Sequence, residues 1–150
     1  MKNVFKKEDA TEIINRINKL TANTAQLWGK MNVGQMLAHC NVTYEMVYDN
    51  KHAAPSGFTK LMLKLFVKKI VVTDKVYKKS SQTAPAFIIK ETKDFEAEKT
   101  RLINYITKTQ ELGESHFDGK ESLSFGALNK TEWNYMFYKH LDHHLNQFGV

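Results

Sequence analysis

Apolar residues recur at intervals of three and four positions over four separate stretches of the chain, and this helical period restricts the fold more than any other feature. The stretches predict helices over residues 7–20, 32–49, 90–112 and 129–148. Gly113 stands where the third helix should end. Three residue pairs have the spacing of a helix-starting capping box: Asp9 with Glu12, Asn32 with Gln35, and Asn129 with Glu132.

A fifth helical stretch, residues 58–71, is basic and amphipathic. Its lysines at positions 60, 64 and 68 form a stripe opposite Leu63, Phe66 and Ile70, which are expected to face inward. Residues 71–89 lose the period, and we expect a loop, or alternatively two short strands at 71–77 and 86–89. The predicted fold is therefore all-α, a four-helix bundle with an extra basic amphipathic helix between the second and third helices.

Composition bounds the rest of the organisation. The chain has 150 residues, two prolines and no Gly/Ser-rich linker, so residues 1–150 are predicted to form a single domain. Its one cysteine, Cys40, has no partner for an intramolecular disulfide and is expected to be buried. No apolar stretch has the length of a membrane span, and the N-terminus lacks the pattern of an export signal. We therefore expect a soluble, cytoplasmic protein.

The net charge of +6 is a local property. Residues 58–79 hold seven lysines and one acid, 7 − 1 = +6, and the other bases and acids cancel, 15 − 15 = 0. A diffuse nucleic-acid-binding surface over the whole domain is not what this distribution shows. Nucleic acid is therefore not expected as a partner.

Three of the six histidines lie close together in the C-terminal sequence HLDHHLNQFGV. At about 100° of rotation per residue, His140 and His144 project into the apolar stripe of their helix, and His143 lies about 60° to one side. Histidines at positions i and i+4 lie one above the other and can bind one metal ion, which would satisfy both rings. His52 and His116 fall in predicted loops and are expected to be solvated.

His39 is the other histidine inside a predicted helix, on the flank of its apolar stripe. Together with His140 and His144 it would supply three nitrogen ligands to a divalent metal ion, with a coordination position left open, as in catalytic sites. Zinc, nickel, manganese and iron(II) all accept such a site, and ligand softness alone does not choose among them. Zinc or nickel is the expected ion. On the residues alone, three structural histidines remain the alternative. Position 141 is Leu, so the Glu of the metalloprotease helix motif is absent.

The stretches WGKMNVGQMLAHC (28–40) and EWNYMFYKHLDHHLNQFG (132–149) resemble the DinB-like, or YfiT-like, superfamily of metalloenzymes. In particular, the chain resembles a branch, a domain of unknown function, with a KHLDHHLxQFG signature in its last helix. The resemblance covers the second and fourth helices and agrees with the helix order of nearly the whole chain. The superfamily's metal triad maps onto His39, His140 and His144. Many relatives have Arg-Gly-Gln after the last ligand, whereas this chain has Leu-Asn-Gln, so only Gln147 matches.

The resemblance implies a metal-dependent hydrolase or a thiol S-transferase, with a small-molecule substrate such as a low-molecular-weight thiol, and a homodimer as in many relatives. His143 is the candidate for proton transfer beside the metal, because imidazole titrates near neutral pH; the alternative is a solvated rim residue. A different class of function is a non-catalytic interaction module, in which the lysine-rich residues 58–79 dock on an anionic surface.

Overall fold

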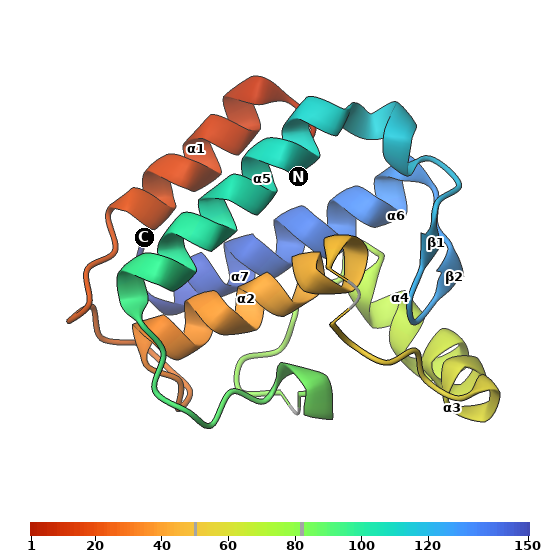
Figure 1. Ribbon diagram of the computed structural model, residues 1–150, viewed down its shortest axis with the longest axis horizontal. Helices are drawn as coiled ribbons and strands as arrows, with labels where there is room; N and C mark the ends of the chain where they lie inside the picture. Colours follow the sequence, from red (N-terminus) through yellow and green to blue (C-terminus); the bar gives the residue numbers. More distant parts are fainter. Residues whose placement is uncertain (50, 82) are drawn as a thin grey trace.

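The computed structural model describes residues 1–49, 51–81 and 83–150, and these residues are predominantly helical (Figure 1), which confirms the all-α prediction. None of the described helices is long and apolar enough to cross a membrane. Two helical turns, η1 and η3, have π geometry and one, η2, has 3-10 geometry. The elements in chain order are α1 (Lys7–Asn18), α2 (Val33–Tyr48), α3 (Gly57–Met62), η1 (Leu63–Val67), α4 (Lys68–Val71), η2 (Pro85–Phe87), α5 (Phe95–Phe117), β1 (Glu121–Ser122), β2 (Gly126–Ala127), α6 (Lys130–Asn134), η3 (Tyr135–Lys139) and α7 (His140–Gln147).

The long helices lie side by side around one apolar core (Figure 1). Helix α5 contacts α1, α2 and α6, and α7 contacts α1 and α2. The rings of Phe117, Trp133 and Phe137 pack together with centroids 5.4 Å apart. Cys40 is buried, as predicted, and burial raises the pKa of its thiol, so the thiol stays protonated. Full burial of each large apolar side chain contributes about 1.5–3 kcal/mol to stability.

Two of the three predicted capping boxes are confirmed. The side chain of Asn32 accepts a hydrogen bond from the backbone N–H of Gln35, and the Gln35 side chain accepts one from the backbone N–H of Asn32. The same reciprocal pair starts α6. At α1 the prediction is wrong: the helix starts after Lys6 without a side-chain cap, because Asp9 instead accepts from the backbone N–H of Asn3.

Helix α5 is displaced from the predicted range 90–112. It begins at Phe95, because the side chain of Asp94 accepts a hydrogen bond from a backbone N–H in the first turn. Gly113 does interrupt the helix, with φ of 73° and ψ of 168°, but one further turn follows it to Phe117. Only a residue without a side chain adopts this backbone conformation readily.

The basic helix over 58–71 forms as α3, η1 and α4, and its lysine stripe runs along the β1–β2 hairpin, with Lys64 exposed and Lys60 and Lys68 partly buried. Lys68 lies 2.9 Å from Glu132, and Lys60 lies 3.8 Å from Glu121. The ammonium group of Lys64 lies over Gly126 in β2. The three lysines therefore point towards the β1–β2 hairpin and the start of α6.

The apolar side of this helix is partly turned outward, contrary to the prediction. Leu63 packs against the core, but Phe66 and Ile70 are exposed. The π turn η1 explains the difference, because its extra residue per turn keeps Leu63, Val67 and Val71 in line against the core and rotates Phe66 and Ile70 away from them.

Residues 71–77 and 86–89 do not pair as strands. Val71 is the last residue of α4, and the second run overlaps η2. Residue 82, within the predicted loop, lies outside the described residues. In the described part of the chain the sheet is limited to β1 and β2, an antiparallel pair with Glu121 opposite Ala127.

Lys139 is a buried cation that holds the C-terminal end of α4. Its ammonium nitrogen donates hydrogen bonds to three backbone carbonyl oxygens, those of Ile70 at 2.7 Å, Thr73 at 2.6 Å and Lys75 at 3.1 Å. Lysines commonly close helix ends in this way, because the last carbonyl groups have no partner within the helix. Lys139, which precedes His140, therefore links the end of α4 to the start of α7 by hydrogen bonds.

The change Lys139→Met is expected to lower the free energy of unfolding by about 2–3 kcal/mol, because it leaves three partly buried carbonyl oxygens without their donor. Urea unfolding followed by circular dichroism measures the change. The matched control is Lys78→Met, at an exposed lysine, which should stay within about 0.5 kcal/mol of wild type. Equal losses in the two variants would show that the buried ammonium group has no special role.

Candidate metal centre

The structure brings His39 of α2 together with His140 and His144 of α7. One nitrogen of each ring lies within 4.8 Å of those of the other two, and the ring centroids are 4.5 to 4.9 Å apart. His39 and His144 are buried, and His140 keeps partial exposure. His39 precedes His140 by 101 residues in the chain, and the three side chains meet where α2 contacts α7.

The last helical segment presents its two histidines from one face. Residues 130–147 form one continuous segment made of α6, η3 and α7, and the π turn η3 ends directly before His140. His144 follows one turn later, so its ring lies next to that of His140. Single π turns inside helices occur frequently at functional sites.

The outer ring nitrogens of His39 and His140 have partners that orient the rings. Nδ1 of His39 lies 2.9 Å from the carbonyl oxygen of Phe87, which can only accept, so Nδ1 carries the proton and Nε2 has a free lone pair. Nδ1 of His140 lies 3.0 Å from the hydroxyl oxygen of Thr43, which can accept in the same way. The Phe87 ring also packs edge-on against both imidazoles.

Gln147 fixes the third ring. Its amide nitrogen donates to the carbonyl oxygen of Trp28 at 2.7 Å, so its amide oxygen, 2.8 Å from Nδ1 of His144, is the acceptor. Gly29 has φ of 85°, and a Cβ there would lie 2.5 Å from the Gln147 amide nitrogen. Glycine is therefore required where the backbone passes this close to the side chain that orients His144.

The Nε2 atoms of the rings face the centre of the cluster. Nε2 of His39 and Nε2 of His140 are 2.9 Å apart. When both rings carry their protons on Nδ1, two lone pairs face each other, and a cation between them relieves the repulsion. Zinc–nitrogen bonds of about 2.0–2.1 Å require ligand atoms a little over 3 Å apart, so small rotations of the rings suffice. The donor set therefore fits a divalent ion.

Burial keeps these rings neutral. It is the main cause that lowers the pKa of His39, holds that of His140 well below the ordinary value, and lowers that of His144 to about 3. The neighbouring imidazoles add to the lowering, because a charge on one ring disfavours a charge on the next. A metal ion binds neutral imidazole, so the rings are held in the protonation state that a ligand needs.

His143 lies beside the cluster and outside it. Its ring is half-buried, 5.0 Å from the ring of His144, and it contacts Trp28 at 6.0 Å and Tyr77 at 5.5 Å between centroids. Burial is the main cause that lowers its pKa; Asp142 opposes the effect and Lys79 adds to it. The aromatic walls distinguish this position from a fully solvated rim.

Thr43 and Phe87 were not anticipated from the sequence, and Gln147 was singled out by the resemblance without a role. Thr43 follows His39 by one helical turn, and Gln147 follows His144 by three residues. A search for polar residues three or four positions after each candidate histidine would therefore find both. Phe87 contributes a backbone oxygen from a stretch without periodicity, and no sequence pattern marks such a contact.

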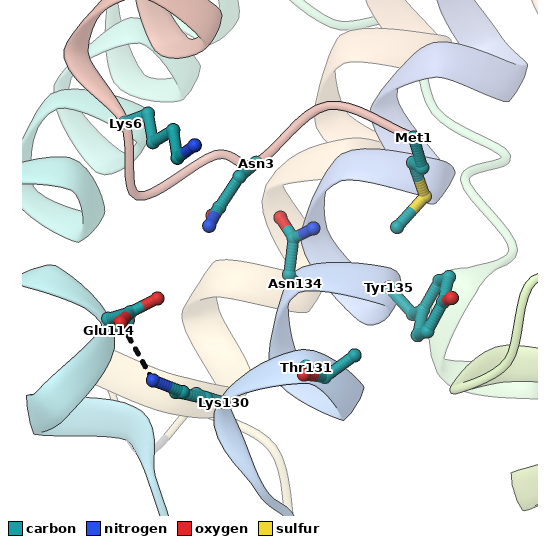
Figure 2. A pocket seen from close by; sticks show the side chains of 8 residues that line it. All are labelled: Met1, Asn3, Lys6, Glu114, Lys130, Thr131, Asn134 and Tyr135. Atoms are coloured by element: carbon teal, nitrogen blue, oxygen red, sulfur yellow. Dashed lines mark hydrogen bonds and ion pairs between the residues drawn. The ribbon is translucent and has the colours of Figure 1, made fainter.

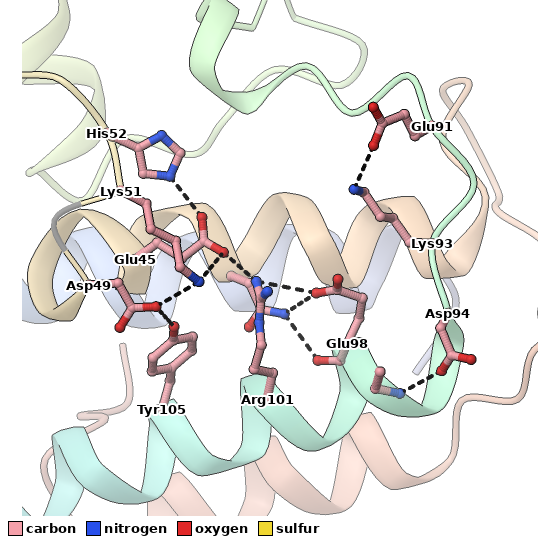
Figure 3. A network of polar contacts seen from close by, with 12 residues as sticks. Glu45, Asp49, Lys51, His52, Glu91, Lys93, Asp94, Glu98, Arg101 and Tyr105 are labelled. Carbon is pink, nitrogen blue, oxygen red and sulfur yellow. Dashed lines mark hydrogen bonds and ion pairs between the residues drawn. The ribbon is translucent and has the colours of Figure 1, made fainter.

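A second polar cluster lies where α2 faces α5 (Figure 3). The buried carboxylate of Glu45 pairs with Arg101 and lies 2.7 Å from Nε2 of His52. Next to it, Asp49 accepts a hydrogen bond from the hydroxyl group of Tyr105. The expectation that His52 is solvated is therefore wrong, whereas His116 is exposed as expected. The cluster joins the two helices, and none of its members belongs to the histidine centre.

A polar hollow of about 340 Å³ also lies away from the histidines (Figure 2). Two of the residues that line it, Lys130 and Glu114, form an ion pair at 2.8 Å. Its lining residues are Met1, Asn3, Lys6, Glu114, Lys130, Thr131, Asn134 and Tyr135. It therefore adds no ligand to the candidate metal centre.

Comparison with known proteins gives a family match. The family described as "Protein of unknown function (DUF1569)" matches residues 2–149. No curated protein and no solved structure gives a significant match.

Proposed function

This chain belongs to the DUF1569 family, whose function is unknown, and we propose that it is a metal-dependent enzyme of the DinB-like superfamily. In this proposal His39, His140 and His144 hold a divalent ion, with zinc or nickel preferred. The observation that carries the proposal is the convergence of three imidazoles whose outer nitrogens are all engaged by other groups. The arrangement of α1, α2, α5 and the segment α6–α7 supports the four-helix bundle of that superfamily.

The proposed reaction is hydrolysis or the transfer of a thiol group. A divalent ion with three neutral ligands keeps its full charge and lowers the pKa of a water or thiol in its open position. Phe87 packs edge-on against the rings of His39 and His140, and burial keeps all three rings neutral and able to bind a cation. The proposed substrate is a small molecule, for example a low-molecular-weight thiol.

His143 is proposed as the group that accepts the proton released by this water or thiol. Its lowered pKa leaves it neutral, and so able to accept, near pH 7. Its ring is adjacent to His144 and lies between Trp28 and Tyr77, which limit its movement. The role is one of proton transfer and does not include metal binding.

Thiol binding to the cobalt(II)-loaded protein tests this function. Cobalt(II) reports sulfur coordination by an intense near-ultraviolet band, and we expect cysteine or 2-mercaptoethanol to produce this band in wild type. His39→Gln, which removes one proposed ligand, should weaken cobalt binding and remove the band. A protein that binds cobalt at the three histidines but shows no sulfur band at millimolar thiol would contradict the thiol substrate.

The rate at which the same band appears tests His143. If His143 accepts the thiol proton, His143→Gln should slow the binding of thiol to the cobalt-loaded protein at pH 7 by about tenfold or more, with cobalt affinity unchanged, because the proton must then pass directly to water. Equal thiol-binding rates in the two proteins would remove the proposed role of His143.

A further inference from the structure

The helical arm formed by α3, η1 and α4, residues Gly57–Val71, carries an apolar stripe that faces away from the protein. Its members are between 39% and 74% exposed, and we call them the arm stripe: Phe58, Leu61, Met62, Leu65, Phe66 and Ile70. In Figure 1 the arm extends to one side of the long helices, with α3 at its far end. Six large apolar side chains are therefore gathered on one free helix face.

The local structure of the arm fixes which side is free. Leu63, Val67 and Val71 pack against the core, and the π turn keeps these three residues in line. The arm stripe lies on the opposite side of the helix. Its exposure therefore follows from how the arm is attached.

The charges of the arm favour a protein partner over a lipid surface. A helix that binds an anionic membrane needs free lysines beside its apolar face. Here Lys60 and Lys68 pair with glutamates of the protein, and the exposed Lys64 lies on the side of the arm next to the β1–β2 hairpin, away from the arm stripe. Lys69 is the arm lysine that lies among the stripe residues. Interface cores between proteins are enriched in Phe and Met, as this stripe is.

The exposed area matches a dimer. Side chains of these sizes and exposures present on the order of 700 Å² per copy, more than the 300–600 Å² of the largest apolar patch on a typical monomer. Two copies would bury on the order of 1,400 Å², within the range of a standard protein interface, about 1,600 Å². A two-fold axis lets the same patch serve both subunits.

We propose that the arm stripe is a homodimer interface, in which the arms of two copies pack against each other about a two-fold axis. A second copy of the chain carries the same apolar stripe, so it supplies a matching surface for this one. Leu65 and Phe66 lie near the middle of the arm along its axis, so changes there fall near the centre of the proposed interface. The proposal does not involve the three histidines and is independent of the metal.

Sedimentation equilibrium of the full chain from about 1 to 100 μM tests the interface. We expect a wild-type dimer, and we expect the double variant Leu65→Glu, Phe66→Glu to raise the dissociation constant at least about 100-fold. The matched control is Val76→Glu, Ile88→Glu, which changes two exposed apolar residues outside the arm and should remain dimeric. Circular dichroism and zinc binding should be equal in all three proteins.

Three results would overturn the proposal. The first is a monomeric wild type at 100 μM, and the second is a dimer that survives in the arm variant. The third is equal dissociation of the control variant, which would place the interface elsewhere. Co-sedimentation with phosphatidylserine-containing vesicles is the companion measurement, because lipid binding by a monomeric wild type, lost in the arm variant, would assign the stripe to a membrane surface instead.

Discussion

His140→Ala is expected to reduce zinc affinity on the order of 1,000-fold. The change removes one of three nitrogen ligands, and it removes the ring whose Nε2 lies 2.9 Å from that of His39. The two remaining imidazoles would bind zinc only weakly and without a fixed geometry. Titration calorimetry on tag-free protein, with a competing chelator for the wild type, measures the difference.

The control for this variant is His116→Ala, at an exposed histidine of α5 outside the cluster, which should leave zinc affinity within about twofold of wild type. Zinc should also raise the melting temperature of wild type and of the control but not of His140→Ala, because a ligand stabilises the folded state that binds it. Equal zinc affinity in all three proteins would rule out His140 as a ligand.

Acid is expected to destabilise the metal-free protein strongly below pH 6.5. The folded state keeps His144 neutral with a pKa of about 3, whereas an unfolded histidine titrates near 6.5. Between these values the unfolded state binds more protons, so the free energy of unfolding falls as the pH falls. At pH 5 this histidine alone should lower it by about 2 kcal/mol. His39 and His140 act in the same direction, since their pKa values are also lowered.

Urea unfolding of chelator-treated protein at pH 7.5 and pH 5 measures this loss. His144→Leu removes the titrating ring, and its free energy of unfolding should change less between the two pH values than that of wild type, by about 2 kcal/mol. His116→Ala should keep the full pH dependence. An unfolding free energy that is equal at the two pH values in wild type would contradict the burial of three neutral imidazoles.

Local patterns explain what could be predicted from the sequence. The capping boxes at Asn32 and Asn129 and the pair His140 and His144 depend on residues three or four positions apart, whose relation any helix reproduces. His39 is indicated by its own helix, because it is the other histidine inside a predicted helix and lies on the flank of that helix's apolar stripe. The Asp9–Glu12 pair failed because Asn3, outside the helix, provides a competing hydrogen bond.

Long-range features could not be predicted in the same way. The outward turn of Phe66 depends on one π turn, and the inward turn of Lys68 depends on Glu132, sixty-four residues later in the chain. The contact between His39 and the carbonyl oxygen of Phe87 comes from a segment with no repeating pattern. Each of these features is set by tertiary packing, which a helical period does not encode.

Anomalous diffraction at the zinc absorption edge, from crystals of tag-free protein grown with zinc, tests the metal centre most directly. We predict a peak about 2.0–2.1 Å from the Nε2 atoms of His39, His140 and His144. A zinc peak bound elsewhere, with none between these three nitrogens, would contradict the proposed centre.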